Sequence, residues 1–132
     1  MMHRTNPSDV HAPMGGYSHI VRVPAAADLL FVAGQVGVDP DGTILQGVRA
    51  QTKQALANLG SCLRAEGASF NDIVRLTVYL TDAGGIAEMA EERRAVFGRI
   101  ALPTSTLLIV SGLARPDLLV EIDAIALQPQ PG

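Results

Sequence analysis

The sequence has no tryptophan, one cysteine and few aromatic or charged residues. Aromatic residues make up 4% of the 132 residues, charged residues make up 17%, and the formal net charge is -3. Proteins that bind nucleic acids need a basic surface, often with aromatic platforms for bases, so this composition argues against a nucleic-acid partner. The single Cys62 excludes an internal disulfide and fits a reducing compartment.

Long apolar runs are also missing. The N-terminal Met-Met-His-Arg-Thr-Asn-Pro has no apolar signal core, and no run approaches the length of a membrane span. We therefore expect a cytoplasmic protein with no membrane partner. A chain of 132 residues fits one domain, 1–132, in which we expect the segment 1–15 and the tail 128–132 to be flexible.

Motifs for metals and phosphates are absent as well. His3, His11 and His19 gather near the N-terminus without the ligand spacing of a zinc site. The stretch 39–42 (Asp-Pro-Asp-Gly) lacks the later glutamate of a calcium loop, and Gly84-Gly85 is not followed by the Gly-Lys-Ser/Thr of a phosphate loop. The sequence predicts neither a metal nor a cofactor.

Apolar residues, in contrast, make up 48% of the chain. Their spacing at steps of three and four predicts two helices, and β-branched or alternating runs predict strands. The predicted strands are 18–23, 29–33, 73–80, 104–110 and 118–126, and the predicted helices are 48–66 and 83–100. Because only Pro24–Asp28 separates the first two strands, we expect them to form a hairpin.

The predicted order β-β-α-β-α-β-β indicates an α+β fold. Each helix follows a strand and returns to another strand, so right-handed crossovers place both helices on the same sheet face. The other face then needs cover, and further copies of the chain are the economical source. The high apolar and low charged content agrees with such an oligomer.

The predicted last strand carries two carboxylates inside an apolar run. Side chains alternate across a strand, so Glu121 and Asp123 share one face while Val120 and Ile122 share the other. A carboxylate among aliphatic neighbours is costly unless it is solvated, paired or used. Glu121 is a candidate for contact with water or a ligand, its alternative being an interface carboxylate. For Asp123 we favour a solvated or salt-bridged acid.

Other residues have simpler interpretations. The run Glu91-Glu92-Arg93-Arg94 is typical of a solvated helix face, and Arg22 and Arg115 of surface charges. Cys62 falls on the apolar stripe of the first helix, which predicts an inert core residue. Tyr17 can close a cleft or pack in an interface. His19, on the same strand face, is a candidate acid–base group, although a strand histidine is more often structural.

Several segments in a fixed order resemble the RidA family, also called YjgF/YER057c/UK114 or L-PSP proteins. The resemblance covers nearly the whole chain and implies a chorismate-mutase-like fold, assembled as a homotrimer with ligand clefts between subunits. The segments that carry it are Gly16-Tyr17-Ser18, Phe31-Val32-Ala33-Gly34-Gln35, 51–59 (QTKQALANL), 72–82 (DIVRLTVYLTD), 103–106 (PTST) and 120–126 (VEIDAIA).

The resemblance implies hydrolysis of reactive imines or enamines, such as 2-aminoacrylate, to a 2-oxo acid and ammonia. In the family members that carry out this deamination, an arginine binds the substrate carboxylate bidentately. A glutamate and backbone groups position a water, and a tyrosine closes the cleft. Tyr17 and Glu121 match the tyrosine and the glutamate, and Gly34 matches the family's turn glycine. We therefore take Glu121 and Tyr17 as the candidate catalytic residues, and Ser105, Thr106, Gly34, Ala33 and His19 as the candidate ligand-binding residues.

The chain departs from the family pattern at the arginine. The deaminating motif Pro-x-Arg-x-Cys reads Pro103-Thr104-Ser105-Thr106-Leu107, so serine replaces arginine and leucine replaces cysteine. Ala33 stands where serine is common, and Ala90 stands near a common asparagine. A hydroxyl supplies no charge, and a small polar residue cannot reproduce a bidentate arginine. The sequence therefore predicts an arginine-lacking subgroup and inefficient deamination of 2-aminoacrylate.

Three functions remain open on this basis. The first is a hydrolase or deaminase in which Glu121 positions water, Tyr17 closes the site and Ser105 anchors an imine-like or 2-oxo-acid-like ligand at the subunit interface. The second is a non-catalytic trimer that binds a metabolite or serves a regulatory role. The third is the endoribonuclease activity attached to L-PSP proteins, which the negative charge disfavours most. Ser105 and Thr106 can also be ordinary strand residues.

Overall fold

The computed structural model of the chain describes residues 2–98 and 102–130. The helices are α1 (Val48–Ala65) and α2 (Ile86–Phe97), and short 3-10 turns, η1 (Phe70–Asp72) and η2 (Ala83–Gly85), precede β4 and α2. The strands are β1 (His3–Thr5), β2 (Ile20–Arg22), β3 (Leu29–Val36), β4 (Ile73–Leu80), β5 (Thr104–Ile109) and β6 (Val120–Leu127). The end of the predicted helix 83–100 lies outside the described residues.

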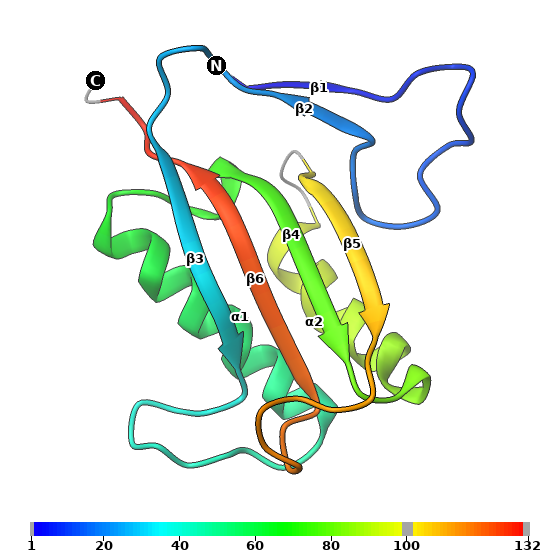
Figure 1. Cartoon of the computed structure of the whole chain (residues 1–132), viewed down its shortest axis with the longest axis vertical. Coiled ribbons are helices and arrows are strands. Elements are labelled where there is room, and N and C mark those ends of the chain that lie inside the picture. The colour runs from blue at the N-terminus through cyan, green and yellow to red at the C-terminus, as the bar shows by residue number, and fades with distance from the viewer. Residues whose placement is uncertain (1, 99–101, 131–132) are drawn as a thin grey trace.

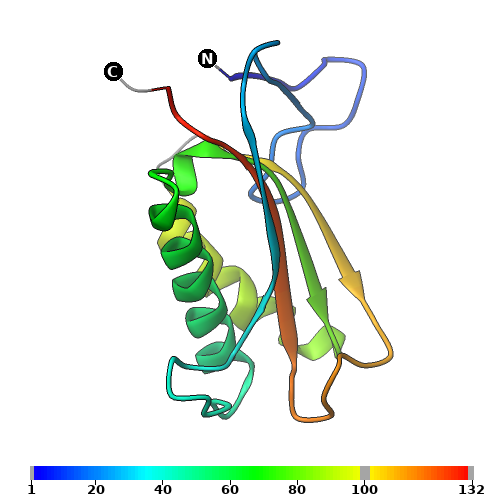
Figure 2. The ribbon, with the colours of Figure 1, turned by 60° about the vertical axis from the view of Figure 1, so that its left-hand side comes forward.

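The main sheet has the strand order β3-β6-β4-β5 (Figure 1). Strands β4 and β5 run parallel, and β6 is antiparallel to both β3 and β4. Figure 2 shows α1 and α2 on the same side of this sheet, as the right-handed crossovers predict. The mixed sheet with two helices confirms the α+β class. In residues 2–98 and 102–130, no helix has the length and hydropathy needed to cross a membrane.

The predicted hairpin between 18–23 and 29–33 is wrong. The strand β2 has three residues and pairs with β1, while β3 has eight residues and pairs with β6 from Leu29↔Leu127 to Val36↔Glu121. A longer partner offers more ladder hydrogen bonds, so β3 joins the main sheet. The prediction also ended the strand at Gly34, where the structure has a register shift between Val32 and Gln35 rather than an end.

Alternation along β6 divides the core from the open face of the sheet. Val120, Ile122, Ala124 and Ala126 are buried against the helices, whereas the residues between them are half-buried on the opposite face. The matching residues of α1 are Leu56, Leu59 and Leu63, which are also buried. Cys62, predicted to be core, is exposed. It lies one position before Leu63, and one residue turns a helix by about 100°, away from the sheet.

A long polar side chain, that of Gln51, also lies inside this apolar layer. Gln51 of α1 is 1% exposed. Its amide nitrogen donates to the carbonyl oxygens of Leu45 and Asp117, both at 2.9 Å, and its carbonyl oxygen accepts from the Leu119 N–H at 2.8 Å. Gln51 thereby connects α1 to the loop after β3 and to the turn that starts β6. Gly37 packs directly on it, because any side chain there would overlap with Gln51.

We predict that Gln51→Leu destabilises the fold by about 3 kcal/mol, because it leaves two carbonyls and one N–H without a partner in a buried place. Urea unfolding at a fixed protein concentration measures the change. The matched control is Gln54→Leu, three residues further along α1. This substitution removes the hydrogen bond from Gln54 to Asn58 at 2.8 Å. Equal destabilisation by the two substitutions would contradict the role given to Gln51.

Candidate functional site

A cavity of about 490 Å³ lies on the helix side of the sheet, beside the edge strand β5. Three segments form its walls: the loop before β2, helix α2 and strand β5. Its principal lining residues are Tyr17, Met89, Ala90, Arg93, Ser105 and Leu107. A smaller cavity of about 320 Å³ adjoins it and is lined by Tyr17, His19, Arg75, Ser105 and Thr106. Tyr17 and Ser105 belong to both, so they lie where the two cavities meet.

Ser105 points from β5 toward α2. It is the register partner of Leu76, a buried residue of the helix-side core. Its hydroxyl accepts a hydrogen bond from Nη1 of Arg93 at 2.8 Å, and Nη2 of Arg93 donates to the Gly16 carbonyl at 2.6 Å. Arg93 therefore joins α2, β5 and the loop before β2 at the cavity wall.

The surroundings of Arg93 leave its charge without an acidic partner. Burial lowers the pKa of its guanidinium, and the guanidinium carbon lies 5.9 Å from the centre of the Phe97 ring. Among the described residues, no carboxylate oxygen lies within ion-pair distance of it. The nearby acids of α2 are engaged elsewhere.

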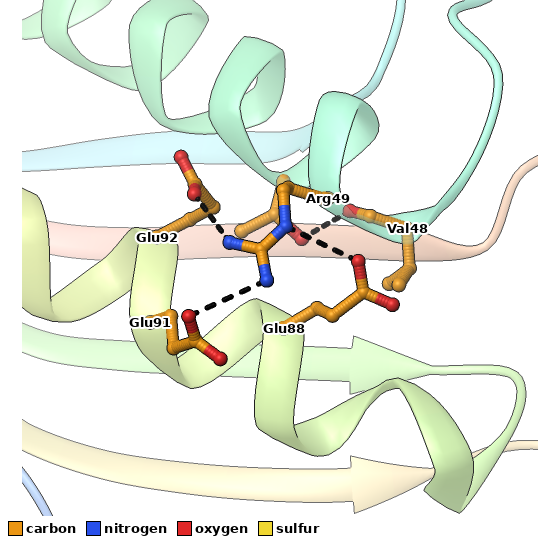
Figure 3. Close-up of polar contacts among 6 residues, drawn as sticks. Val48, Arg49, Glu88, Glu91 and Glu92 are labelled. Carbon is orange, nitrogen blue, oxygen red and sulfur yellow. Dashed lines mark hydrogen bonds and ion pairs between the residues drawn. The ribbon is translucent and has the colours of Figure 1, made fainter.

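Those acids bind Arg49 of α1 (Figure 3). Its guanidinium lies 3.2 Å from Glu88, 3.4 Å from Glu91 and 2.9 Å from Glu92. The hydrogen bond to Glu92 is the main cause of the raised pKa of Arg49. Since Arg49 is half exposed, this cluster holds the two helices together only weakly.

The predicted solvated face at Glu91-Glu92-Arg93-Arg94 is thus wrong for Arg93. Arg94 and Glu91 are exposed, but Arg93 is half-buried and faces the cavity. A signal was present in the sequence. Arg93 follows Met89 by four residues and precedes Phe97 by four, and both are buried. Residues four apart share a helix face, so the spacing placed Arg93 with the apolar stripe. Arg22 and Arg115 are exposed, as expected.

The predicted site residues Tyr17 and His19 lie in contact. Their rings pack edge to face with centroids 5.5 Å apart, and the Tyr17 hydroxyl accepts from the Met14 N–H at 3.1 Å. A ring nitrogen of His19 lies 2.7 Å from the His11 carbonyl, and the His19 N–H donates to Oδ1 of Asn6 at 2.8 Å. These bonds hold the loop before β2 as one wall of both cavities.

Glu121 lies on the other side of the sheet, over β3. Its carboxylate occupies the space above Gly34, where any Cβ would overlap with it. The adjacent Ala33 is exposed. Asp123, on the same face, accepts a hydrogen bond from the Tyr79 hydroxyl at 2.7 Å. This bond is the main cause of the raised pKa of Tyr79. Asp123 is therefore bonded to a side chain, whereas Glu121 has no hydrogen bond among the described residues.

Strand register separates the predicted site residues into two groups. Glu121 is opposite Tyr79, which is opposite Leu108, so these three share the open face, together with Thr106. Ser105 points to the helix face. The strand β4 lies between β6 and β5, so Glu121 and Ser105 are also two strand spacings, about 10 Å, apart across the strands. Their partners on β4, Tyr79 and Leu76, are three residues apart, which separates them further along the strands. One chain alone therefore does not bring Glu121 and Ser105 into one cavity.

The open face around Glu121 carries large apolar side chains. Phe31 is 74% exposed, Leu108 is 45% exposed and Leu29 is 44% exposed. Large exposed apolar side chains on one sheet face are typical of a surface that binds another protein chain. Figure 2 shows no helix over this side of the main sheet.

Comparisons of the sequence with known proteins identify its family. The sequence model of the endoribonuclease L-PSP family matches residues 8–128. A RutC family protein of Pyrococcus horikoshii is 40% identical over 86% of this chain and 88% of its own length. The 2-iminobutanoate/2-iminopropanoate deaminase of Mus musculus is 39% identical over 89% of this chain and 84% of its own length.

Solved structures agree as well. YyfB of Yersinia pestis, from the conserved Rid protein family, superposes with a TM-score of 0.87 at 32% identity, covering 96% of this chain and 98% of its own. TdcF of E. coli with bound serine superposes with a TM-score of 0.73 at 30% identity, covering 89% of this chain and 91% of its own. The chain belongs to the endoribonuclease L-PSP family, whose members are also known as RidA, YjgF or Rid proteins.

Proposed function

We propose that this protein hydrolyses small imines or enamines in clefts between three copies of the chain. The observation that carries the proposal is the separation of its polar groups. One cavity, on the helix face of the sheet, is lined by Ser105, Tyr17 and Arg93. The Glu121 carboxylate lies on the other face and has no hydrogen-bond partner among the described residues. A second copy that packs its open face beside β5 would bring such a carboxylate to the cavity.

The relatives support this reaction class. The mouse relative is named for deamination of 2-iminobutanoate and 2-iminopropanoate, and TdcF was solved with serine bound. The two 2-imino acids of that name and serine share a short carbon chain with nitrogen on the carbon next to a carboxylate. A cavity of about 490 Å³ has ample room for a molecule of that size.

Hydrolysis of an imine needs few catalytic groups, because the imine carbon is already electrophilic. Water attacks the imine carbon and adds across the C=N bond, and Glu121 accepts a proton from the attacking water. That proton passes to the nitrogen, which gives a carbinolamine with one hydroxyl and one amino group. The hydroxyl proton then moves to the amino group, the C–N bond breaks, and ammonia leaves as the C=O bond of the 2-oxo product forms. Tyr17 closes the cavity at its junction with the smaller one, which limits the positions open to the substrate.

Because Ser105 stands where the deaminating motif has arginine, we propose that the chain belongs to a subgroup that lacks arginine on β5. Leu107 and Ala90 also make the cavity more apolar than the deaminating motif does. This favours, as a second candidate, a trimer that binds a metabolite without turnover. The endoribonuclease activity in the family name finds less support, because the net charge is -3. We expect the protein in the cytoplasm, where its lone cysteine stays reduced.

We predict that Glu121→Gln slows imine hydrolysis about 100-fold, because an amide cannot accept the proton of the attacking water. Imines generated in situ by an amino-acid oxidase are the substrates, and loss of semicarbazone formation measures their hydrolysis. The control is Asp123→Asn, on the same strand and face, where the acid binds only Tyr79; its rate should stay within about threefold of wild type. If wild type does not accelerate hydrolysis of any imine in a broad panel, the non-catalytic trimer is the better account.

We also predict that the protein sediments as three chains of 13.9 kDa each. Phe31→Asp should dissociate it, because Phe31 stands 74% exposed on the open face that the other copies cover. The matched control is Ser61→Asp, which adds the same charge at an exposed position of α1 on the helix side. A monomer for the wild type, or a trimer unaffected by Phe31→Asp, would contradict the proposed assembly.

A further inference from the structure

We propose that Arg93 is the anion-binding residue of the cavity beside β5, and that the cavity takes small aliphatic carboxylates. The positive charge comes from helix α2 instead of from the strand. Ser105, expected to anchor the ligand itself, becomes a positioning residue for the guanidinium. The inference deepens the proposed function and rests on it for the cavity being the place where substrate binds.

The first support is an uncompensated charge. Arg93 is half-buried at the cavity wall, and its two hydrogen-bond partners, the Ser105 hydroxyl and the Gly16 carbonyl, are neutral. A partly desolvated cation is costly unless an anion or several dipoles face it. Glu88, Glu91 and Glu92 are the acids of the same helix, and all three bind Arg49. Within one chain, the cavity is the place left for a balancing anion.

The second support is the geometry of the donors. A guanidinium has five N–H groups, and Ser105 and Gly16 occupy two of them. Three remain for a ligand, which is enough for the paired hydrogen bonds that arginine makes to a carboxylate. Because Ser105 and Gly16 come from two different segments, they hold the guanidinium plane before the ligand arrives. Less conformational entropy is then lost on binding.

The third support is the rest of the cavity wall. Met89, Ala90, Phe97 and Leu107 are apolar and surround the space next to Arg93. Arg94, which also lines the cavity and is exposed, adds a second positive charge. One end of the ligand is therefore anionic and the remainder is aliphatic. A phosphate ester or a polyol would leave polar groups without partners against these side chains.

Binding of 2-oxobutanoate and of its uncharged amide, 2-oxobutanamide, tests the proposal by calorimetric titration. Arg93→Met removes the charge and keeps an apolar side chain of similar length. We expect it to weaken 2-oxobutanoate binding at least tenfold, as loss of hydrogen bonds to a charged group predicts, and to leave the amide within about twofold. Arg93→Lys keeps the charge without the paired geometry and should fall between Arg93→Met and wild type.

The matched control is Arg64→Met. Arg64 is an exposed arginine of α1 that also donates to a serine, Ser61, at 3.0 Å, but it does not line this cavity. The Arg64→Met variant should bind 2-oxobutanoate and 2-oxobutanamide as tightly as wild type does. Circular dichroism and melting of each variant establish that it is folded. Glu121→Gln should still bind 2-oxobutanoate, so a failure of catalysis and a failure of this inference give different results.

Three outcomes would overturn the inference. Wild type fails to bind 2-oxobutanoate, Arg93→Met binds it as tightly as wild type, or Arg93→Met loses the acid and the amide to the same degree. The first would mean that another group, such as a carboxylate of a neighbouring copy, already balances Arg93. The second and third would mean that Arg93 only supports the cavity wall.

Discussion

The alternation of side chains across the main sheet is the constraint on which the rest of this structure depends. It sends Val120 and Ile122 into the core and leaves Glu121 on the open face. The same rule sends Ser105 toward α2 and Thr106 to the side of Glu121. One chain therefore does not bring Glu121 and Ser105 to the same face of the sheet. The proposed reaction draws on groups of both faces, so in that proposal it needs more than one copy of the chain.

In the proposed assembly, the edge strand β5 is where a second copy would meet the cavity. It forms one wall of both cavities and contributes Ser105 to each. Arg93 fixes this wall to α2 and to the loop before β2. Gln51 has the same structural role at the opposite end of the sheet, where it joins α1 to two loops. In both places one polar side chain with several donors or acceptors holds segments that apolar contacts alone would leave free to slide.

Local patterns were sufficient for most elements and failed where the answer depended on distant partners. The strand 73–80 agrees with β4 to the residue, because a β-branched run bounded by turn signals is strong local information. The prediction of a hairpin was wrong because β2 and β3 each pair with a strand that is more distant in the sequence. Cys62 was wrong because a stripe defined by steps of three and four is wider than the buried part of the helix. Flexibility of the segment 1–15 stays a prediction.

The family, the α+β class and the placement of Glu121 and Asp123 on one strand face followed from the sequence alone, since motif order and side-chain alternation are local properties of a chain. The sequence also showed that β5 carries no arginine at residue 105. Only the tertiary structure revealed that Arg93, on α2, lines the cavity to which Ser105 belongs. The reason is physical: which cation faces a cavity depends on how a helix packs against an edge strand, and that contact joins residues 12 positions apart whose meeting no local pattern encodes.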